Sequence, residues 1–519
     1  MFRKIAWMAL CILVVCEAST ALATEGVVFG QDTAEWTLDK YRQKSLAIHD
    51  PEVIYEDGKY YIYYTNYRLT YVSEDLYTWK VAGERPLGWY ADEPSPTSWA
   101  PCALRLKKPY VAENGEIYDY VLLDGLSAWG SQDSRIRGFV MKEPAPASQK
   151  EILYIGDVMS SGIYAFQDPD ATYRSFEGTY NGKETTYYRV NNYANAFERA
   201  EDNGWNAMDQ TLFYDAEDRL WMVWGSYHGG IFVCEMNQET LMPMSNDART
   251  YTRIAKYPGY GPMEGATIMY HDGYYYLCMA YGDIWNTYNI RIARSEAVTG
   301  PYYDYNGVNV DQGGTKGSGY FGTKLAGPYA FDGDAGWKGQ GHCAFVHNPD
   351  TDEYFLLGNG RPGNDTSNAR LIVRSILWLE SGWPVLSPEL ATVETTRAAD
   401  GKAAVPSVQD IPREMIASEY EVIYFLRTAT ETSKQMRSQR ITLHENGTVT
   451  GAMTGSWQQV NGSHITLELD GLVIEAAVTA SYDWEKQKTG VITFSGLTEP
   501  GSAYLGEYGT AVWGKQVVD

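Results

Sequence analysis

The chain of 519 residues has few cysteines and no excess of positive charge. The cysteines that follow the first 23 residues are widely spaced and show no metal-type pairing: Cys102, Cys234, Cys278 and Cys343. A disulfide framework is therefore excluded, and free, largely buried thiols are expected. The formal net charge of −24 argues against nucleic acid and other anionic polymers as partners. A neutral substrate would feel little of this field.

Long apolar runs are missing after the N-terminus. Residues 1–23 predict a signal peptide, because Arg3 and Lys4 precede an apolar stretch that ends in the small-x-small site Ala21-Leu22-Ala23. No later segment is long and apolar enough to span a membrane. We therefore expect a secreted protein, either extracellular or in a bacterial periplasm. A lipid anchor at Cys16 is the less favoured alternative, because Val15 is bulkier than the residue that usually precedes a lipidated cysteine.

Long helical periodicity is also hard to find, and a repeated strand–turn–strand unit takes its place. An acidic residue, a short apolar strand, a tight turn and an aromatic strand recur in three copies that begin at Asp50, Asp209 and Glu264. Two looser copies begin at Cys102 and His342, which gives five units between residues 45 and 380. Their irregular spacing favours a closed propeller over a solenoid, because a propeller tolerates insertions in its loops. The sequence thus predicts an all-β fold built on a β-propeller.

The remaining segments predict a second, smaller domain. The longest insertion, residues 144–201, precedes the third unit, and residues 396–412 form a linker rich in Ala, Thr, Pro and Val. After the linker, strands flank turn signals at Asn446-Gly447 and Asp470-Gly471. We predict a signal peptide at 1–23, a propeller at 24–395, the linker at 396–412, and a small β-sandwich or barrel at 413–519.

The three acidic copies indicate a possible active site. Repeats related by rotation would bring Asp50, Asp209 and Glu264 together at one end of the propeller. Glycosidic cleavage needs an acid to protonate the leaving oxygen and a base or nucleophile on the other face. A third carboxylate can hold the pKa of the acid up through like-charge repulsion. The alternative is that each acid merely begins a strand or a turn, which three copies in register make less favoured. Hydrolysis of a neutral polysaccharide is therefore the leading hypothesis.

A set of short motifs resembles those of a known enzyme family. The motifs occur in the order seen in glycoside hydrolase family 43, and residues 45–390 most resemble its arabinan endo-1,5-α-L-arabinosidases. These motifs are His49-Asp50-Pro51, Trp99-Ala100-Pro101, Asn206-Ala207-Met208-Asp209, residues 225–231, Glu264-Gly265, residues 287–291, Gly341-His342 and residues 382–385. Residues 446–449, 455–457 and 513–515 are similar to the β domain appended to some members.

The resemblance implies a five-bladed propeller that cleaves with inversion. Asp50 corresponds to the general base, Asp209 to the residue that modulates the pKa of the acid, and Glu264 to the general acid. An inverting geometry implies roughly 6.5 to 9.5 Å between the Asp50 and Glu264 carboxyl groups. The implied substrate is plant cell-wall arabinan or its oligosaccharides, cut at internal bonds, and a monomer is expected.

The resemblance also implies a substrate cleft and a metal. The residues that correspond to the cleft lining are His49, Trp99, Asn206, Tyr227, His228, Tyr288 and Asn289. His342 corresponds to a histidine beside a metal, usually calcium, on the propeller axis. A histidine alone is a poor calcium ligand because that ion prefers oxygen, so a buried histidine with satisfied hydrogen bonds is the alternative.

Three residues depart from the family pattern, and two other functions stay open. Cys102, Gln210 and Cys343 stand where the family commonly has aspartate, proline and asparagine. An exo-acting arabinanase or arabinofuranosidase is the alternative within the enzyme class, since the insertion at 144–201 could close one end of a groove. A catalytically silent polysaccharide-binding propeller is the alternative outside it.

Overall fold

The computed structural model describes a large part of the chain. The described ranges are 46–65, 69–84, 98–126, 134–161, 173–180, 183–190, 205–227, 229–245, 250–256, 261–312, 322–391, 411–426, 434–501 and 508–518. The predicted signal peptide, Cys16, His228 and most of the predicted linker lie outside the described residues. The predicted domain limits therefore stay predictions.

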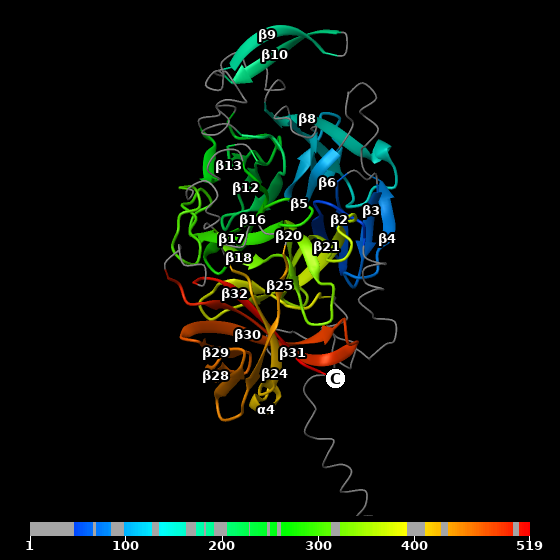
Figure 1. Ribbon diagram of the computed structural model, residues 1–519. Helices are drawn as coiled ribbons and strands as arrows, with labels where there is room; N and C mark the ends of the chain where they lie inside the picture. The colour runs from blue at the N-terminus through cyan, green and yellow to red at the C-terminus, as the bar shows by residue number, and fades with distance from the viewer. Residues whose placement is uncertain are drawn as a thin grey trace, which may run out of the picture.

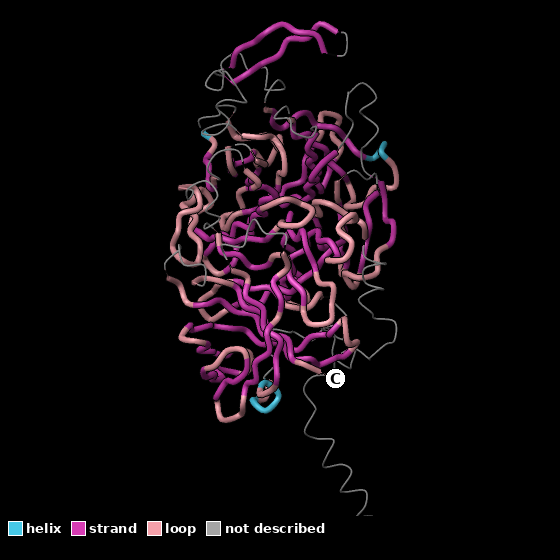
Figure 2. Tube along the Cα trace, viewed as in Figure 1, coloured by secondary structure: helices cyan, strands magenta, loops and turns pink. Residues whose placement is uncertain are grey.

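Within these ranges the chain forms five antiparallel blades and a closed barrel, which confirms the predicted all-β propeller followed by a small β domain. Strands and loops make up nearly all of the described trace in Figure 2, and helix is confined to short segments. Figure 1 shows the propeller strands in the middle of the molecule, the barrel strands below them, and a hairpin above.

The blades follow one another along the chain. Blade 1 contains β1 (Glu52–Glu56), β2 (Lys59–Tyr63), β3 (Leu69–Ser73) and β4 (Lys80–Glu84), and blade 2 contains β5 (Ser98–Val111), β6 (Ile117–Leu126), β7 (Arg135–Met141) and β8 (Ile152–Ser160). Blade 3 contains β11 (Thr211–Tyr214), β12 (Leu220–Trp224), β13 (Ile231–Met236) and β14 (Thr252–Ala255), and blade 4 contains β15 (Met263–His271), β16 (Tyr274–Tyr281), β17 (Asn289–Ser295) and β18 (Thr323–Ala326). Blade 5 contains β19 (Tyr329–Ala330), β20 (Trp337–Asn348), β21 (Glu353–Pro362), β22 (Arg370–Trp378) and β23 (Pro384–Leu386).

Turn chemistry fixes the register of several hairpins. Asp57-Gly58 connects β1 to β2, and both residues have positive φ, 49° and 76°. This is the backbone of a two-residue type I′ turn, whose twist matches that of the flanking strands. Asp272-Gly273 makes the same turn between β15 and β16. The predicted hairpins therefore form where the aspartate–glycine pairs place them.

The first strands of the blades close the propeller. Contacts run from β1 to β5, from β5 to β11, from β11 to β15, from β15 to β20, and from β20 back to β1. Apolar clusters fill the spaces between successive blades: Phe213 and Ile231 of blade 3, for example, pack with Ile268 and Leu277 of blade 4. The core is thus divided among the blade interfaces, and the starts of the five inner strands meet around one axis.

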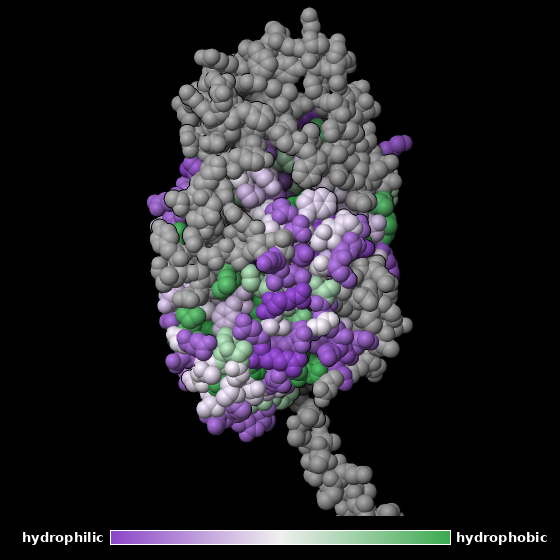
Figure 3. All heavy atoms as spheres, in the orientation of Figure 1, coloured by the Kyte–Doolittle hydropathy of each residue, from purple (hydrophilic) through white to green (hydrophobic). Residues whose placement is uncertain are grey.

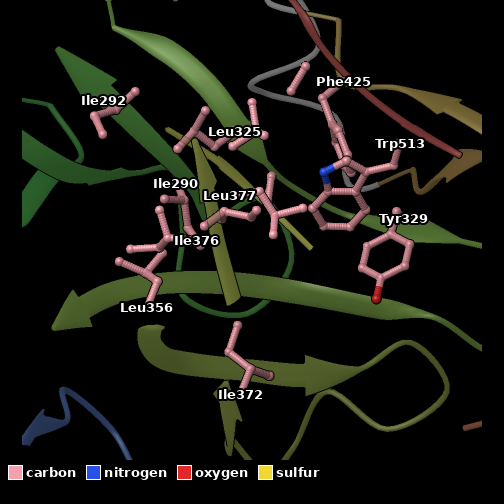
Figure 4. Packing of buried hydrophobic residues seen from close by; sticks show 14 of the residues in the cluster. Ile290, Ile292, Leu325, Tyr329, Leu356, Ile372, Ile376, Leu377, Phe425 and Trp513 are labelled. Carbon is pink, nitrogen blue, oxygen red and sulfur yellow. The ribbon is translucent and has the colours of Figure 1, made fainter. Parts of the chain in front are cut away.

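The barrel comprises the last strands of the chain and docks on blades 4 and 5. Its elements are α4 (Arg413–Ile416), β24 (Glu419–Tyr424), β26 (Gln439–Leu443), β27 (Thr448–Gly451), β28 (Gly455–Asn461), β29 (His464–Leu469), β30 (Leu472–Asp483), β31 (Lys488–Thr498) and β32 (Ala511–Gln516). A further strand, β25 (Met436–Arg437), pairs in parallel with β19 of the propeller. Figure 4 shows Phe425 and Trp513 of the barrel region beside Tyr329 and Leu377 of blade 5.

Three smaller features complete the description. A 3-10 turn, η2 (Gln149–Glu151), precedes β8, and β9 (Tyr173–Tyr180) pairs with β10 (Lys183–Val190) as a separate hairpin inside the predicted insertion. The four cysteines named above are free and buried, as predicted.

No helix in the described part of the chain is long and apolar enough to cross a membrane. Figure 3 shows mainly hydrophilic residues on the described surface of the lower half of this face, with apolar residues in scattered spots.

Candidate active site

A residue in the left-handed backbone region lies within or just before each inner strand. The φ angles are 53° at Asp50, 41° at Ala100, 55° at Asp209, 60° at Gly265 and 46° at His342. For residues other than glycine this conformation costs about 1–3 kcal/mol and persists only where the surrounding structure enforces it. Such strain clusters at functional sites, and here it falls on three of the predicted site residues.

The predicted register of the three carboxylates is wrong by one residue in blade 4. Gly265, and not Glu264, occupies the position that Asp50 and Asp209 hold in their blades. A Cβ at Gly265 would lie 2.9 Å from Cγ of His342, so a side chain does not fit there. The carboxylate of blade 4 is therefore carried by the preceding residue, which pairs with Ala280 of β16.

Asp50 is held from three sides. Thr65 donates a hydrogen bond to Oδ2 at 2.5 Å, and Nδ1 of His342 lies 3.0 Å from Oδ1. Asn359 accepts a hydrogen bond from the backbone N–H of Asp50 at 3.2 Å. Burial alone would raise the pKa of Asp50, but the charge and the hydrogen bond of His342 outweigh it and hold that pKa well below its usual range. Asp50 is therefore an ionised carboxylate at neutral pH.

His342 is the cation of this centre. Burial would lower its pKa, but the charges of Asp50 and Asp209 and the hydrogen bond to Asp50 raise it to about 10. The imidazole is thus protonated at neutral pH and carries positive charge on the propeller axis.

Glu264 has the opposite character to Asp50. Tyr288 donates a hydrogen bond to Oε1 at 2.8 Å, and Ser226 donates one to Oε2 at 2.9 Å. Burial and the charge of Asp209 raise the pKa of Glu264 to about 7. Near neutral pH a substantial fraction of this group keeps its proton, which is what a general acid requires.

The pKa of Asp209 lies between those of Asp50 and Glu264. Its Oδ2 accepts a hydrogen bond from the backbone N–H of Gly265 at 3.3 Å, which fixes it to the strand that carries Glu264. Burial raises its pKa to about 6, with His342 opposing that rise and Asp50 adding to it. Three carboxyl groups therefore meet at one end of the propeller, one with a lowered pKa and two with raised pKa values, which is a pattern that assigns acid and base roles.

The predicted cleft residues fall into two groups. His49, Trp99 and Tyr227 are partly exposed beside this centre, and Tyr288 reaches it through its hydroxyl group. Asn206 and Asn289 are buried: the amide of Asn289 donates to the carbonyl groups of Tyr281 and Thr287, and that of Asn206 to Ser226. This corrects the expectation that these two asparagines line the cleft, because their amide hydrogen bonds are used inside the fold. His228 lies outside the described residues.

Arg361 is a residue of the candidate site that the sequence did not reveal. It is fully buried, and its Nη2 donates a hydrogen bond to Nε2 of His49 at 2.9 Å. Because a guanidinium only donates, His49 must accept through Nε2 and carry its proton on Nδ1. Burial also lowers the pKa of His49. His49 is thus a neutral imidazole whose Nδ1–H remains as a donor.

Thr65 and Asn359 were missed as well, since isolated polar residues late in a strand give little signal. Asn359 and Arg361 alternate along β21 within an apolar strand, and that pattern was the one available clue.

Among the departures from the family pattern, Gln210 donates a hydrogen bond to the carbonyl group of Ala100, and Cys102 accepts one from the N–H of Leu212. Both residues therefore tie adjacent inner strands together.

The donor set around His342 fits calcium poorly. Nδ1 already pairs with Asp50, and calcium takes six to eight oxygen ligands, whereas the imidazole offers only nitrogen. In the described ranges, the set of three clustered His, Cys, Asp or Glu donors consists of Glu389, Asp483 and Glu485, away from His342. The calcium site stays a prediction, and no catalytic step is assigned to a metal.

Comparisons with known proteins agree with this geometry. Residues 185–384 match glycosyl hydrolases family 43, and residues 398–506 match a C-terminal lipocalin-like domain. An extracellular endo-alpha-(1->5)-L-arabinanase of Thermotoga petrophila is 28% identical over 501 residues, which cover 91% of this chain and 94% of that protein. Extracellular endo-alpha-(1->5)-L-arabinanase 2 of Bacillus subtilis is 26% identical over 89% of this chain and 93% of its own length.

A solved structure supports the same relationship. The crystal structure of endo-1,5-alpha-L-arabinanase from Thermotoga petrophila has a TM-score of 0.71 and 25% identity, over 91% of this chain and 99% of that one. Both domain matches agree with the observed architecture, a five-bladed propeller with three carboxyl groups at its axis followed by an eight-stranded barrel. The chain thus carries a domain that matches glycosyl hydrolases family 43, followed by a domain that matches a lipocalin-like family.

Proposed function

We propose that the protein is a secreted, inverting endo-arabinanase that hydrolyses internal α-1,5-L-arabinofuranosidic bonds of arabinan. The observation that carries the proposal is the opposite surroundings of two carboxyl groups at one site: Asp50 pairs with Nδ1 of His342 at 3.0 Å, which lowers its pKa, whereas burial and Asp209 raise the pKa of Glu264 to about 7. The extracellular arabinanases that resemble the chain over about nine-tenths of its length support the substrate and the location.

Asp50 acts as the general base in this proposal. One carboxylate oxygen accepts the proton of a water molecule as that water attacks the anomeric carbon. Thr65 and His342 fix the orientation of the carboxylate, and a carboxylate has about four lone-pair sites, so it can still accept from water. The base is ready at neutral pH because His342 keeps it charged.

Glu264 acts as the general acid and donates its proton to the departing sugar oxygen. Ser226 and Tyr288 hold its two oxygens, and the buried charge of Asp209 keeps its proton in place until the bond breaks. This single displacement inverts the anomeric carbon, and it implies a gap of roughly 6.5 to 9.5 Å between the two carboxyl groups for the water.

Two measurements on linear arabinan test the proposal. Timed digestion followed by chromatography is expected to give a ladder of oligosaccharides early in the reaction, and one released sugar from the outset would overturn endo action. Proton NMR of the first products is expected to show the inverted, β anomer. Retention of the α anomer would remove Asp50 from the role of base, because a covalent route would then be required.

A further inference from the structure

We propose that Trp285 is a sugar-binding platform of this enzyme: one face of its indole ring rests on Arg361, and the other stacks on a neutral sugar unit beside the cleavage point. The inference rests on the proposed function, and it adds a subsite residue that the motif pattern does not include.

Trp285 is an exposed aromatic residue, whereas most tryptophans in the described part of the chain are buried. It is 49% exposed, whereas Trp224, Trp337, Trp484 and Trp513 are fully buried. Tryptophan offers a large apolar face, and such faces suit the C–H surfaces of sugars.

The loop that carries Trp285 has a fixed conformation. The carboxylate of Asp283 accepts hydrogen bonds from the backbone N–H groups of Trp285, Asn286 and Thr287, at 3.0, 2.9 and 3.2 Å. The carbonyl group of Asp283 accepts a further bond from the N–H of Tyr288 at 2.8 Å. Because the loop is ordered before a ligand arrives, binding loses little conformational entropy.

Arg361 supports the ring from beneath. Its guanidinium carbon lies 4.1 Å from the centre of the indole ring, and Nε donates a hydrogen bond to the carbonyl group of Ile284 at 2.7 Å. Nη1 donates to the carbonyl group of Thr366 at 2.7 Å. With Nη2 bonded to His49, each part of this buried side chain is engaged, so the indole ring sits on a rigid base.

The same loop connects both sides of the catalytic centre. Its last residue, Tyr288, donates a hydrogen bond to Glu264, while Ile284 and Trp285 lie on Arg361, which binds the neighbour of Asp50. Strand β20 approaches the loop so closely that a Cβ at Gly339 would lie 2.6 Å from the carbonyl oxygen of Ile284. Trp285 is therefore tied to the rim of the carboxylate site and not to a distant surface.

The chemistry of the platform favours a neutral ligand. Arg361 already occupies the electron-rich face of the indole ring, so a second cation on this ring would be repelled by a charge in contact with it. An anion would meet the acidic surface of a chain with a formal charge of −24. A neutral saccharide with apolar C–H faces is the class that remains.

Three variants test this assignment: Trp285→Ala, Trp285→Phe and the control Tyr303→Ala, which removes an exposed aromatic residue of blade 4. Each is assayed for KM and kcat on linear arabinan and, in a Glu264→Gln background, for arabino-oligosaccharide affinity by calorimetry. Loss of one stacking contact is expected to raise KM and weaken binding about tenfold in Trp285→Ala, with kcat changed less. Trp285→Phe is expected to restore most of the affinity, and Tyr303→Ala to match the parent enzyme.

The outcomes separate the two proposals. If the parent enzyme hydrolyses arabinan and Trp285→Ala keeps the parent KM and oligosaccharide affinity, the platform is overturned and the proposed function stands. If Phe fails to restore binding that Ala has lost, stacking is not the cause and the platform is likewise overturned. If the parent enzyme leaves arabinan intact, the proposed function itself fails.

Discussion

Two buried clusters in this protein have the same composition, three carboxyl groups around one cation, but different environments. The catalytic cluster combines Asp50, Asp209 and Glu264 with His342 at the propeller axis. The interface cluster combines Glu389 of the propeller with Asp483, Glu485 and Lys515 of the barrel. Nζ of Lys515 lies 3.2 Å from Glu389, 3.5 Å from Asp483 and 2.9 Å from Glu485.

The two clusters differ in backbone strain and in how their charges are balanced. Asp50, Asp209 and His342 have positive φ, whereas none of the four described interface residues does. At the interface, burial lowers the pKa of Lys515, but the three carboxylates raise it well above its usual range, so the cation is permanent. In the catalytic cluster the cation pairs with Asp50 alone at hydrogen-bonding distance and lowers its pKa, while burial raises the pKa values of Asp209 and Glu264. The catalytic cluster thus places a carboxyl group of lowered pKa beside two of raised pKa, while Lys515 links the propeller to the barrel.

The largest difference is expected from the same substitution in each cluster. Glu264→Gln removes the catalytic proton and is expected to lower kcat on arabinan by roughly 10³-fold. Glu389→Gln is expected to leave kcat unchanged, because Glu389 pairs with Lys515 at the interface of propeller and barrel and not with the catalytic carboxyl groups. Steady-state kinetics, with thermal unfolding to verify folding, measures both. Undiminished turnover in Glu264→Gln would remove that residue from the acid role.

Substitutions in the interface cluster are expected to change the free energy of unfolding and not the turnover of arabinan. Lys515→Met leaves three buried carboxyl groups without their cation and is expected to lower the free energy of unfolding by about 3 kcal/mol. Arg440→Met is the matched control, because it removes a cation that bridges the barrel to Asp332 at an exposed site, where a pair contributes about 0–1 kcal/mol. Chemical denaturation compares the two. Equal losses would show that burial of the Lys515 cluster has no special effect.

The smallest effect is expected in the pH profile. Glu264 must keep its proton, so kcat/KM is expected to be high below its raised pKa of about 7 and to fall about tenfold per pH unit above it. Asp209→Asn removes the negative charge that raises this pKa, so the alkaline limb is expected to move to lower pH by roughly one unit. Asp483→Asn, in the other cluster, serves as the control and should leave the limb in place. An alkaline limb that does not move in Asp209→Asn would contradict the role of Asp209.

Much of the fold was predictable because its signals are local. The aspartate–glycine pairs at 57–58 and 272–273 set hairpins through their own backbone preferences. The alternation of apolar and aromatic residues around them marks the strands, so five repeated units and a second β domain follow from the chain itself. The acidic residues at the starts of three units were visible for the same reason.

The parts of the site that were missed depend on contacts between distant residues. Arg361 binds His49 across 312 positions of the chain, and Asn359 binds Asp50 across 309. The one-residue offset of Glu264 was hidden as well, because only the packing of His342 against Gly265 excludes a side chain there. The same holds for Asn289, whose burial no local pattern reveals.

The sequence alone determined the class of fold, the number of blades and which carboxyl groups are available, because strand periodicity and turn chemistry act over a few neighbouring residues. The tertiary structure decided which carboxyl group has a lowered pKa and which has a raised one. That outcome depends on burial and on the distance to His342, quantities that exist only once five strands from separate parts of the chain meet around one axis.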